Sequence, residues 1–438
     1  MSSATLRALG PPGILLAVTA AGIHNPLVVS LGLSALAGLF TFQAIPVVSG
    51  VFVAHGRAGK DLLKVGTPVI PESMGAIAGV IYIIAMFLFI PVPFVKWFRE
   101  SSFALGDGDL VFPHNKFAQV LGGLLALMSM LFLGFADDVL DIRWRVKIWL
   151  PLIASMPLLM VYCVTYGGTD VVVPIPLRPL FDGKLVHLGI FYYAFMAALA
   201  IFSTNAINIL AGVNGVEAGQ SLVIALSIAA NDVLQLFRNP SRAEAHLTSL
   251  YFVLPFIGVT IGFLAHNWYP ARAFPGDTYC YFAGMIFAVV GILGNFSKTV
   301  LLFMLPQIFN FVYSCPQLFH IVDCPRHRMP SLDPKTGLLN PTSFLIPASP
   351  SLPARLIIRI FSATGLLRIT KRDPKTRAPL AANNLTLMNL LLVRIGPMRE
   401  QNLALAVVVV QAACSALAFV VRYGLVRWVY DVAEDNRA

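Results

Sequence analysis

Residues 134–147 read Gly-Phe-Ala-Asp-Asp-Val-Leu-Asp-Ile-Arg-Trp-Arg-Val-Lys. They follow roughly twenty apolar residues, enough to cross a membrane as one helix. The run places three carboxylates and three cations at the mouth of that segment, where charges are costly unless they face a cavity, a partner or an ion. Asp137 and Asp141 share one face if the helix continues. The run indicates Mg²⁺ or proton chemistry with an anionic substrate such as phosphate. The simpler alternative is a helix cap with salt bridges.

The composition is that of a polytopic membrane protein. Only 12% of the 438 residues are charged and 57% are hydrophobic, whereas soluble domains carry roughly 25% charged residues. The net charge of +10 would suggest nucleic acid as a partner of a soluble protein. In a membrane protein, binding to anionic lipid headgroups and anionic substrates explains the positive charge better, so we expect no nucleic-acid partner. The five cysteines have no CxxC spacing and predict neither a zinc site nor a disulfide framework.

Hydropathy predicts an all-α protein with about ten transmembrane helices and a small insertion between the ninth and the tenth. The expected helices cover 27–53, 75–95, 117–136, 148–166, 188–210, 219–237, 248–265, 279–297, 299–320 and 400–423. The expected parts are 1–320 with helices one to nine, 321–398 as a loop or subdomain, and 399–438 with the last helix and tail. The apolar stretch at 11–21 lacks the basic region of a signal peptide, so we expect no cleavage there.

The loops that follow the odd-numbered helices all lie on one side of the membrane, and they carry every polar cluster of the chain. These loops contain residues 59–73, 134–147, 208–220, 266–278 and 324–328. Chance would scatter such clusters over both faces, so their convergence predicts a catalytic or binding site at one membrane surface. The Lys and Arg residues near the helix ends leave the orientation undecided.

Several residues in these loops suit phosphate chemistry, although each has a structural alternative. Asp277 lies in a Pro-Gly-Asp-Thr turn and offers a carboxylate for Mg²⁺, or it simply caps the next helix. Asn205 and Asn208 are three residues apart on one helix face and could bind a ligand or bond to a neighbouring helix. Lys147 could instead anchor lipid headgroups, and Glu72 could be a first-turn helix charge. Residues 326–328, Arg-His-Arg, suit phosphate or lipid headgroups.

Five strings together resemble one family, the polyprenyl-phosphate N-acetylhexosamine-1-phosphate transferases of the glycosyltransferase family 4 type. Their eukaryotic branch, which tunicamycin inhibits, is the most similar. The strings are Phe-Ala-Asp-Asp at 135–138, Asn-Ala-Ile-Asn-Ile-Leu-Ala-Gly-Val-Asn-Gly at 205–215, His-Asn-Trp-Tyr-Pro at 266–270, Gly-Asp-Thr at 276–278 and Cys-Pro-Arg-His-Arg at 324–328.

The resemblance implies transfer of GlcNAc-1-phosphate from UDP-GlcNAc to dolichyl phosphate. The products are GlcNAc-diphosphodolichol and UMP, in the first step of N-glycan precursor synthesis. The resemblance also implies the endoplasmic reticulum membrane, with the active site and the 321–398 insertion on the cytosolic face. The implied partners are UDP-GlcNAc, dolichyl phosphate and the lipid bilayer. A homodimer is compatible with the sequence, which shows no specific interface.

By position, Asn208 and Asp277 match the family's Mg²⁺ ligands, and Lys147 matches the residue that holds dolichyl phosphate. Asp137 and Asp138 match the essential acidic pair, whose role is general base, metal positioning or orientation of Lys147. A phosphate monoester needs little deprotonation at neutral pH because its second pKa is about 6. We therefore favour direct attack by the lipid phosphate, with the pair acting electrostatically. A covalent aspartyl intermediate is the alternative.

The resemblance assigns three further groups of residues. Positions around the uridine are Lys60, Asp61, Leu62, Glu72 and Asn214. The loop for the diphosphate and the N-acetyl sugar contains Arg326, His327 and Arg328. The wall along the lipid phosphate consists of Ile201, Phe202, Ser203, Thr204, Asn205, Ala206, Ile207, Asn208 and Ile209.

Three other functions compete with this one. A bacterial-type enzyme would pass another UDP-sugar to undecaprenyl phosphate, but the Arg-His-Arg loop and the long ninth loop argue against it. An ion-coupled transporter would carry acids at mid-membrane depth in two related halves, whereas here the acids lie at helix ends and no internal repeat is visible. A non-catalytic paralogue would have lost acidic or Mg²⁺-binding positions, and all of them are occupied here.

Overall fold

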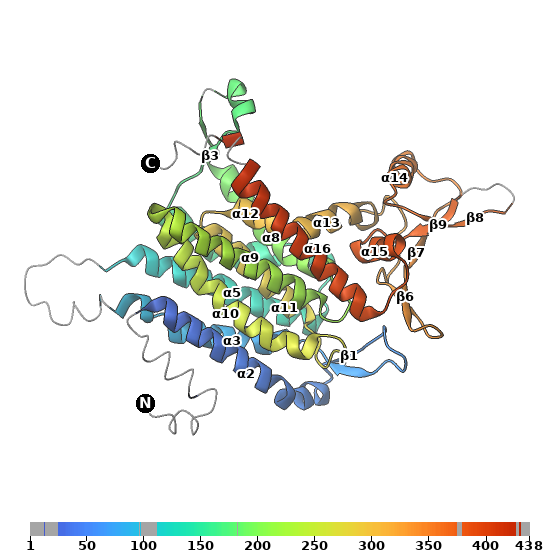
Figure 1. The fold of residues 1–438 in the computed structure, drawn as a ribbon, viewed down its shortest axis with the longest axis horizontal. Helices are drawn as coiled ribbons and strands as arrows, with labels where there is room; N and C mark the ends of the chain where they lie inside the picture. The colour runs from blue at the N-terminus through green and yellow to red at the C-terminus, as the bar shows by residue number, and fades with distance from the viewer. Residues whose placement is uncertain are drawn as a thin grey trace, which may run out of the picture.

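The computed structural model describes residues 25–95, 112–181, 183–374 and 379–425, with Gly13, Trp97, Val429 and Tyr430. Over these residues the chain is a bundle of long helices, with small sheets beyond its ends (Figure 1). Apart from Gly13, the stretch at 11–21 lies outside the described residues.

The described helices confirm the expected all-α membrane class. Each of the ten expected segments is helical, and eight of the described helices are long and apolar enough to cross a membrane. These eight are α2 (Pro26–Ala54), α3 (Gly75–Phe89) continued by η1 (Val92–Phe94), α5 (His114–Leu140), α8 (Ile190–Ile209), α9 (Val216–Arg238), α10 (Ala243–Asn267) preceded by η3 (Pro240–Arg242), α11 (Gly276–Leu293) and α16 (Glu400–Val420) continued by η4 (Val421–Leu425).

Two expected spans differ from straight membrane-crossing helices. The ninth consists of α12 (Ser297–Phe303) and α13 (Leu305–Leu318), which meet at 72°. Pro306, in the first turn of α13, has no N–H to continue the hydrogen-bond ladder of α12. The fourth, α7 (Leu150–Thr165), has 16 residues, fewer than the roughly 20 of a full crossing. By length and composition, the described residues therefore hold eight helices that could cross a membrane, or nine if the bent pair counts as one span.

The centre of the bundle is α11, whose residues from Thr278 to Leu293 are all buried. This helix packs against α3, α5, α8 and α10, a position that suits a helix apolar on every side. Small residues allow the close approach, since a Cβ on Gly284 would lie 2.3 Å from the Cα of Thr204 in α8. Close packing on every side fixes the N-terminus of α11, which carries Asp277.

A proline inside α2 is accommodated by a side chain from α10. Pro46 has no N–H, so the carbonyl of Phe42, one turn earlier, lacks its helical partner. The His266 Nε2 donates to that carbonyl at 2.8 Å, and the two rings stack at 4.8 Å. His266, the first residue of the His-Asn-Trp-Tyr string, therefore joins two helices of the bundle.

We expect His266→Ala to destabilise the protein by about 1–3 kcal/mol, because it leaves a partly buried carbonyl without a donor. Thermal unfolding in detergent would measure the change. The control is His55→Ala, which removes an exposed bond to the carbonyl of Val51 at the end of α2 and should change stability by about 0.5 kcal/mol or less. Equal melting temperatures for the His266 variant and the wild type would contradict this role.

Short strands and helices complete the fold. The antiparallel hairpin of β1 (Ala58–Lys60) and β2 (Val69–Pro71) follows α2. The hairpin of β3 (Asp170–Val172) and β4 (Leu185–His187) lies far from it, near the start of α8 (Figure 1). The shortest helices are α6 (Trp144–Lys147), η1 (Val92–Phe94), η2 (Ile175–Leu180), η3 (Pro240–Arg242) and η4 (Val421–Leu425).

The described residues of 321–398, which exclude 375–378, lie beside the β1 end of the bundle (Figure 1). Their elements are β5 (Ser331–Asp333), β6 (Leu338–Asn340), β7 (Ser343–Leu345), α14 (Leu352–Ala363), β8 (Ile369–Arg372), β9 (Pro379–Asn383) and α15 (Leu387–Ile395). The strands β5 and β6 form a hairpin, and a three-stranded sheet has the order β7-β9-β8. Phe344, Ile358 and Leu385 pack on Tyr313 of α13, which attaches this region to the bundle.

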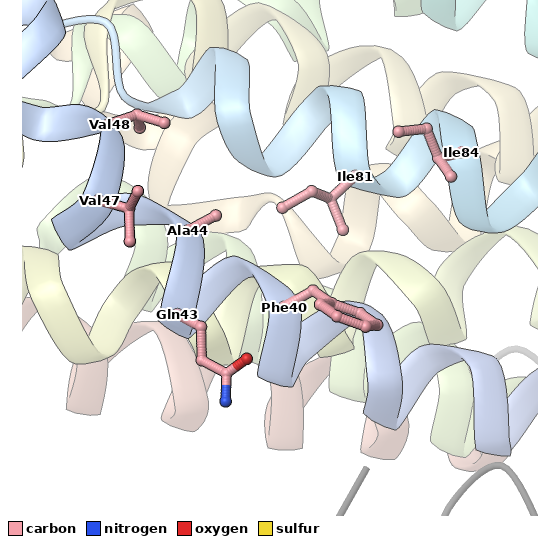
Figure 2. Close-up of a pocket in the computed structure, with 7 residues that line it drawn as sticks. All are labelled: Phe40, Gln43, Ala44, Val47, Val48, Ile81 and Ile84. Carbon is pink, nitrogen blue, oxygen red and sulfur yellow. The ribbon is translucent and has the colours of Figure 1, made fainter. Parts of the chain in front are cut away.

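Large apolar side chains such as Phe40, Phe132 and Val409 are exposed on the bundle helices, as contact with the apolar tails of lipid requires. A groove of about 470 Å³ runs between α2 and α3 (Figure 2). It is lined by Phe40, Gln43, Ala44, Val47, Val48, Ile81 and Ile84. None of these is a predicted site residue, so the groove belongs to the outer surface rather than to the candidate site.

Candidate active site

The polar loops that the sequence placed on one face meet at one end of the bundle. Apolar residues of four separate segments pack together there: Leu63 after β1, Val213 between α8 and α9, Leu339 of β6 and Leu403 of α16. This packing leaves the polar residues of the same segments side by side.

Asp277, in the first turn of α11, is the centre of the site. Its Oδ2 lies 2.8 Å from the Lys147 Nζ of α6, and its Oδ1 accepts a hydrogen bond of 3.0 Å from the Asn208 Nδ2 at the end of α8. The structure therefore brings together both predicted Mg²⁺ ligands and the predicted lipid-phosphate lysine.

Asp137 faces the same lysine from the end of α5. Its Oδ2 lies 2.9 Å from the Lys147 Nζ and accepts a bond of 3.0 Å from the Tyr281 hydroxyl. The other oxygen accepts from the N–H of Ile142, and the residue is buried. Sequence reasoning missed Tyr281, although it lies four residues after Asp277 and so on the same face of α11.

Asp138 has a different task from Asp137. Its carboxylate accepts from the backbone N–H groups of Asp277 and Thr278, at 2.7 and 3.2 Å, and from the Thr278 hydroxyl. It therefore caps α11 from another helix, where a negative charge also suits the helix dipole. Arg57 donates to the Asp138 carbonyl at 2.8 Å. Thr278 and Arg57 were not predicted as site residues.

Asp277 does not cap α11, although the sequence also allowed that role. The residue at the N-cap of α11 is Pro275, which makes no side-chain cap bond, and Asp138 supplies the missing acceptor. The Asp277 carboxylate is thus left for Lys147 and Asn208. Glu72 likewise lies before α3, whose first turn holds no acid.

We expect Gly276→Ala to reduce activity by at least about tenfold. Gly276 has φ +68°, which strains an L residue, and an added Cβ would lie 2.3 Å from the Asp138 Oδ2. The substitution should therefore displace Asp138 and, with it, Asp277. A turnover assay would test this, with Gly66→Ala as control, since Gly66 also has a positive φ (+82°) but has open space around it. Similar losses in both variants would contradict the role of the contact.

The charges of the site shift the pKa of two groups outside the membrane-spanning helices. Burial alone would lower the pKa of Lys147, but its ion pairs with Asp277 and Asp137 outweigh burial and raise it. Lys147 is therefore a permanent cation at neutral pH. Glu72 has an exposed outer surface, but the protein around its carboxyl group partly desolvates it and raises its pKa, and the negative charges of Asp138 and Asp277 raise the pKa further. Glu72 thus lies within electrostatic reach of the acidic cluster.

The predicted uridine region adjoins this cluster. Asp61 and Asn214, both buried, come together through a bond of 3.1 Å from the Asn214 Nδ2 to the Asp61 Oδ2. Lys60, Leu62 and Glu72 are exposed beside them on the β1–β2 hairpin and its flanks. Two partners of this group, Lys64 and Glu400, were missed, because Glu400 is more than 180 residues from Asn214 in the chain.

The predicted lipid-phosphate wall, residues 201–209 of α8, divides between two environments. Ser203, Thr204, Ala206 and Ile207 are buried in the bundle, so they support the wall rather than line it. The members that are only partly buried are Ile201, Phe202, Asn205, Asn208 and Ile209. Asn205 bonds to the Ile201 carbonyl of its own helix at 2.8 Å, not to a neighbouring helix.

The Arg-His-Arg loop lies against the loop that carries Asn214. A Cβ on Gly212 would lie 2.0 Å from the Sδ of Met329, which follows Arg328. Arg326 and His327 are exposed. The Arg328 Nη1 is buried and has no hydrogen-bond partner among the described residues. A guanidinium with one buried N–H donor and no bonded partner for it suits a phosphate or carboxylate.

The residues present fit a magnesium ion whose remaining ligands come from substrate. Within the described part of the chain, no group of three or more His, Cys, Asp or Glu side chains is placed to hold a metal. Mg²⁺, however, commonly takes one or two protein oxygens together with substrate phosphates and water. Asp277 offers a carboxylate, and the adjacent Asn208, whose Nδ2 contacts Asp277 in this structure, would offer its Oδ1 after rotation of the amide group.

Comparison with known proteins agrees with this arrangement. The sequence model described as "Glycosyl transferase family 4" matches residues 120–295. A Schizosaccharomyces pombe protein named UDP-N-acetylglucosamine–dolichyl-phosphate N-acetylglucosaminephosphotransferase is 48% identical, over 94% of this chain and 95% of its own. Proteins of the same name from Saccharomyces cerevisiae and Dictyostelium discoideum are 42% and 40% identical, over 92% and 88% of this chain and 92% and 86% of theirs. The chain therefore belongs to glycosyl transferase family 4.

Proposed function

We propose that this protein transfers GlcNAc-1-phosphate from UDP-GlcNAc to dolichyl phosphate, releasing UMP. The observation that carries the proposal is the contact of Asp277 with both Lys147 and Asn208, beside Asp137, at one end of a membrane bundle. Such a site can hold two phosphorylated substrates, one from water and one from the membrane. The names of the similar proteins point to the same pair of substrates.

In the proposed reaction, an oxygen of the lipid phosphate attacks the β-phosphorus of UDP-GlcNAc. The bond from that phosphorus to the bridging oxygen breaks, and UMP leaves with that oxygen. Lys147 lies 2.8 Å from Asp277 and 2.9 Å from Asp137, so its charge is held at the point where phosphate groups would meet. It orients the lipid phosphate and offsets charge in the transition state.

We assign the two acids of α5 to electrostatic and positioning roles. Asp137 holds Lys147, and Asp138 holds the backbone of Asp277. The lipid phosphate is mostly a dianion at neutral pH, since its second pKa is about 6, so no general base is needed. Asp277 and Asn208 would hold Mg²⁺, which supplies charge neutralisation on the pyrophosphate of the nucleotide sugar when bound.

The remaining predicted residues surround this centre. We assign Asp61, Asn214 and the exposed hairpin residues to the uridine, and Arg326, His327 and Arg328 to the diphosphate and the N-acetyl sugar. The open donor of Arg328 supports that assignment. The partly exposed face of residues 201–209 would line the path of the lipid phosphate. The proposed setting is the endoplasmic reticulum membrane, with this end of the bundle in the cytosol.

Release of UMP from UDP-GlcNAc by the purified protein in detergent tests the proposal. We expect release only when both dolichyl phosphate and Mg²⁺ are present, and inhibition by tunicamycin. Parallel reactions with undecaprenyl phosphate and with other UDP-sugars would reveal a bacterial-type specificity. Folded protein that releases no UMP from UDP-GlcNAc under any of these conditions would refute the proposed function.

A further inference from the structure

Lys64 and Glu400 form an ion pair next to the predicted uridine region. Lys64 lies in the loop after β1, and Glu400 lies in the first turn of α16. Their side chains are 16% and 3% exposed, so solvent does not screen the pair as it would at the surface. The Lys64 ammonium also lies over the ring of Tyr269, 4.5 Å from its centre.

Each member of the pair holds one residue of the uridine region. The Lys64 Nζ lies 3.2 Å from the Asp61 Oδ2, and the Glu400 Oε1 accepts a bond of 3.0 Å from the backbone N–H of Asn214. The Asn214 Nδ2 in turn donates to Asp61. The four residues therefore form a closed ring that joins the hairpin, the loop between α8 and α9, and the last long helix of the bundle.

The loop that carries Asn214 depends on such contacts because it is buried and irregular. Two of its backbone N–H groups are bonded to carboxylates: Glu217 accepts from the N–H of Gly212 at 2.7 Å, and Glu400 accepts from the N–H of Asn214. Glu217 lies only five residues from Gly212 and ties the loop to its own helix. Glu400 ties the loop to the hairpin through Lys64, and thus sets the distance between Asn214 and Asp61.

We propose that Lys64 and Glu400 are positioning residues for the nucleotide. They hold Asp61 and Asn214, which come from two separate loops, in the single arrangement that receives the uridine of the UDP-sugar. The inference rests on the proposed function and deepens it, because it names the residues that preorganise one of its two substrate sites.

The variant Glu400→Gln separates positioning from folding. Glutamine keeps an acceptor for the N–H of Asn214 but removes the charge that holds Lys64. We expect the KM for UDP-GlcNAc to rise roughly tenfold, while kcat and the KM for dolichyl phosphate change by less than about twofold. A lower kcat or a higher KM for dolichyl phosphate, with the KM for UDP-GlcNAc unchanged, would overturn the inference.

A double-substitution cycle tests whether the two residues act together. Lys64→Met alone should raise the KM for UDP-GlcNAc about as much as Glu400→Gln, and the double variant should be little worse than either, since both break the same ring. Effects that multiply would show that the residues act separately and overturn the proposal. If Glu400→Gln does not fold, Lys64→Met replaces it, because Lys64 is the more exposed of the two residues. The same changes in the two KM values then decide the outcome.

The matched control is the ion pair of Lys116 with Glu244, which joins α5 and α10 at the other end of the bundle. Lys116→Met and Glu244→Gln should leave both KM values unchanged.

Calorimetric titration with UDP provides a readout without turnover, and the variants of Lys64 and Glu400 should bind UDP about tenfold more weakly than the wild type. Wild-type protein that binds UDP but releases no UMP would refute the proposed function alone. Ring variants with wild-type UDP affinity, beside an active wild type, would refute the inference alone.

Discussion

Replacement of Asp277 by alanine should lower turnover by about a thousandfold or more, because a lost charge contact at a reacting phosphate costs several kcal/mol. The change removes one of the two assigned Mg²⁺ ligands. It also leaves Lys147 with Asp137 as its remaining carboxylate contact among the described residues and deprives Asn208 of its acceptor. Steady-state UMP release at several Mg²⁺ concentrations would measure the loss.

The matched control for Asp277 is Asp141→Asn. Asp141 ends α5 with a left-handed backbone (φ +48°), which asparagine tolerates, and its side chain is exposed. It lies in the same acidic run as Asp137 and should be replaceable with activity kept within about twofold. Full activity of Asp277→Ala at low Mg²⁺ would show that this carboxylate does not hold the metal.

The second large effect is expected for Lys147→Ala, which should lower kcat/KM for dolichyl phosphate by about a hundredfold or more. Without the ammonium, the negative charges of Asp137 and Asp277 lose the cation that lies between them and that is assigned to the lipid phosphate. The KM for UDP-GlcNAc should change much less, because the uridine region is built on other segments. Initial rates with each substrate varied in turn would separate the two effects.

Lys298→Ala is the control for this lysine. Lys298 lies in α12, just beyond the other end of α11, and should affect neither substrate. If Lys147→Ala leaves the KM and kcat for dolichyl phosphate unchanged, the role assigned to Lys147 is wrong. Lys147→Arg should recover little, because the larger, planar guanidinium would not place its charge where the compact ammonium lies between the two carboxylates.

The sequence predicted the meeting of the polar loops because helix order alone places alternate loops on one side. It could not predict which acid does what. Asp137 and Asp138 are adjacent and chemically identical, yet their side chains diverge on α5, so one contacts Lys147 and the other caps α11. The different contacts of Asp137 and Asp138 depend on the position of the N-terminus of α11 relative to α5, which the local sequence does not predict.

Other features escaped prediction for a similar reason. Hydropathy does not register the 72° break between α12 and α13, since a bent helix pair is as apolar as a straight one. The wall at 201–209 was taken from resemblance as a continuous stretch, whereas a helix turns each successive side chain by about 100° and buries four of them. Glu400 stood out in no motif, because its partners lie in loops far away in the chain.

The place of Glu400 in the last long helix has a consequence for biogenesis. A nascent chain that has inserted α2 to α13 already contains Asp137, Lys147, Asn208 and Asp277. Its Asn214 loop nevertheless still lacks the carboxylate that ties it to the hairpin. The proposed uridine site can therefore reach its final arrangement only after the ribosome has passed residue 400 and α16 has packed against the bundle. A chain that ends before this helix should keep the residues assigned to the phosphate groups but bind UDP poorly. Incomplete translation products would then not sequester UDP-sugar.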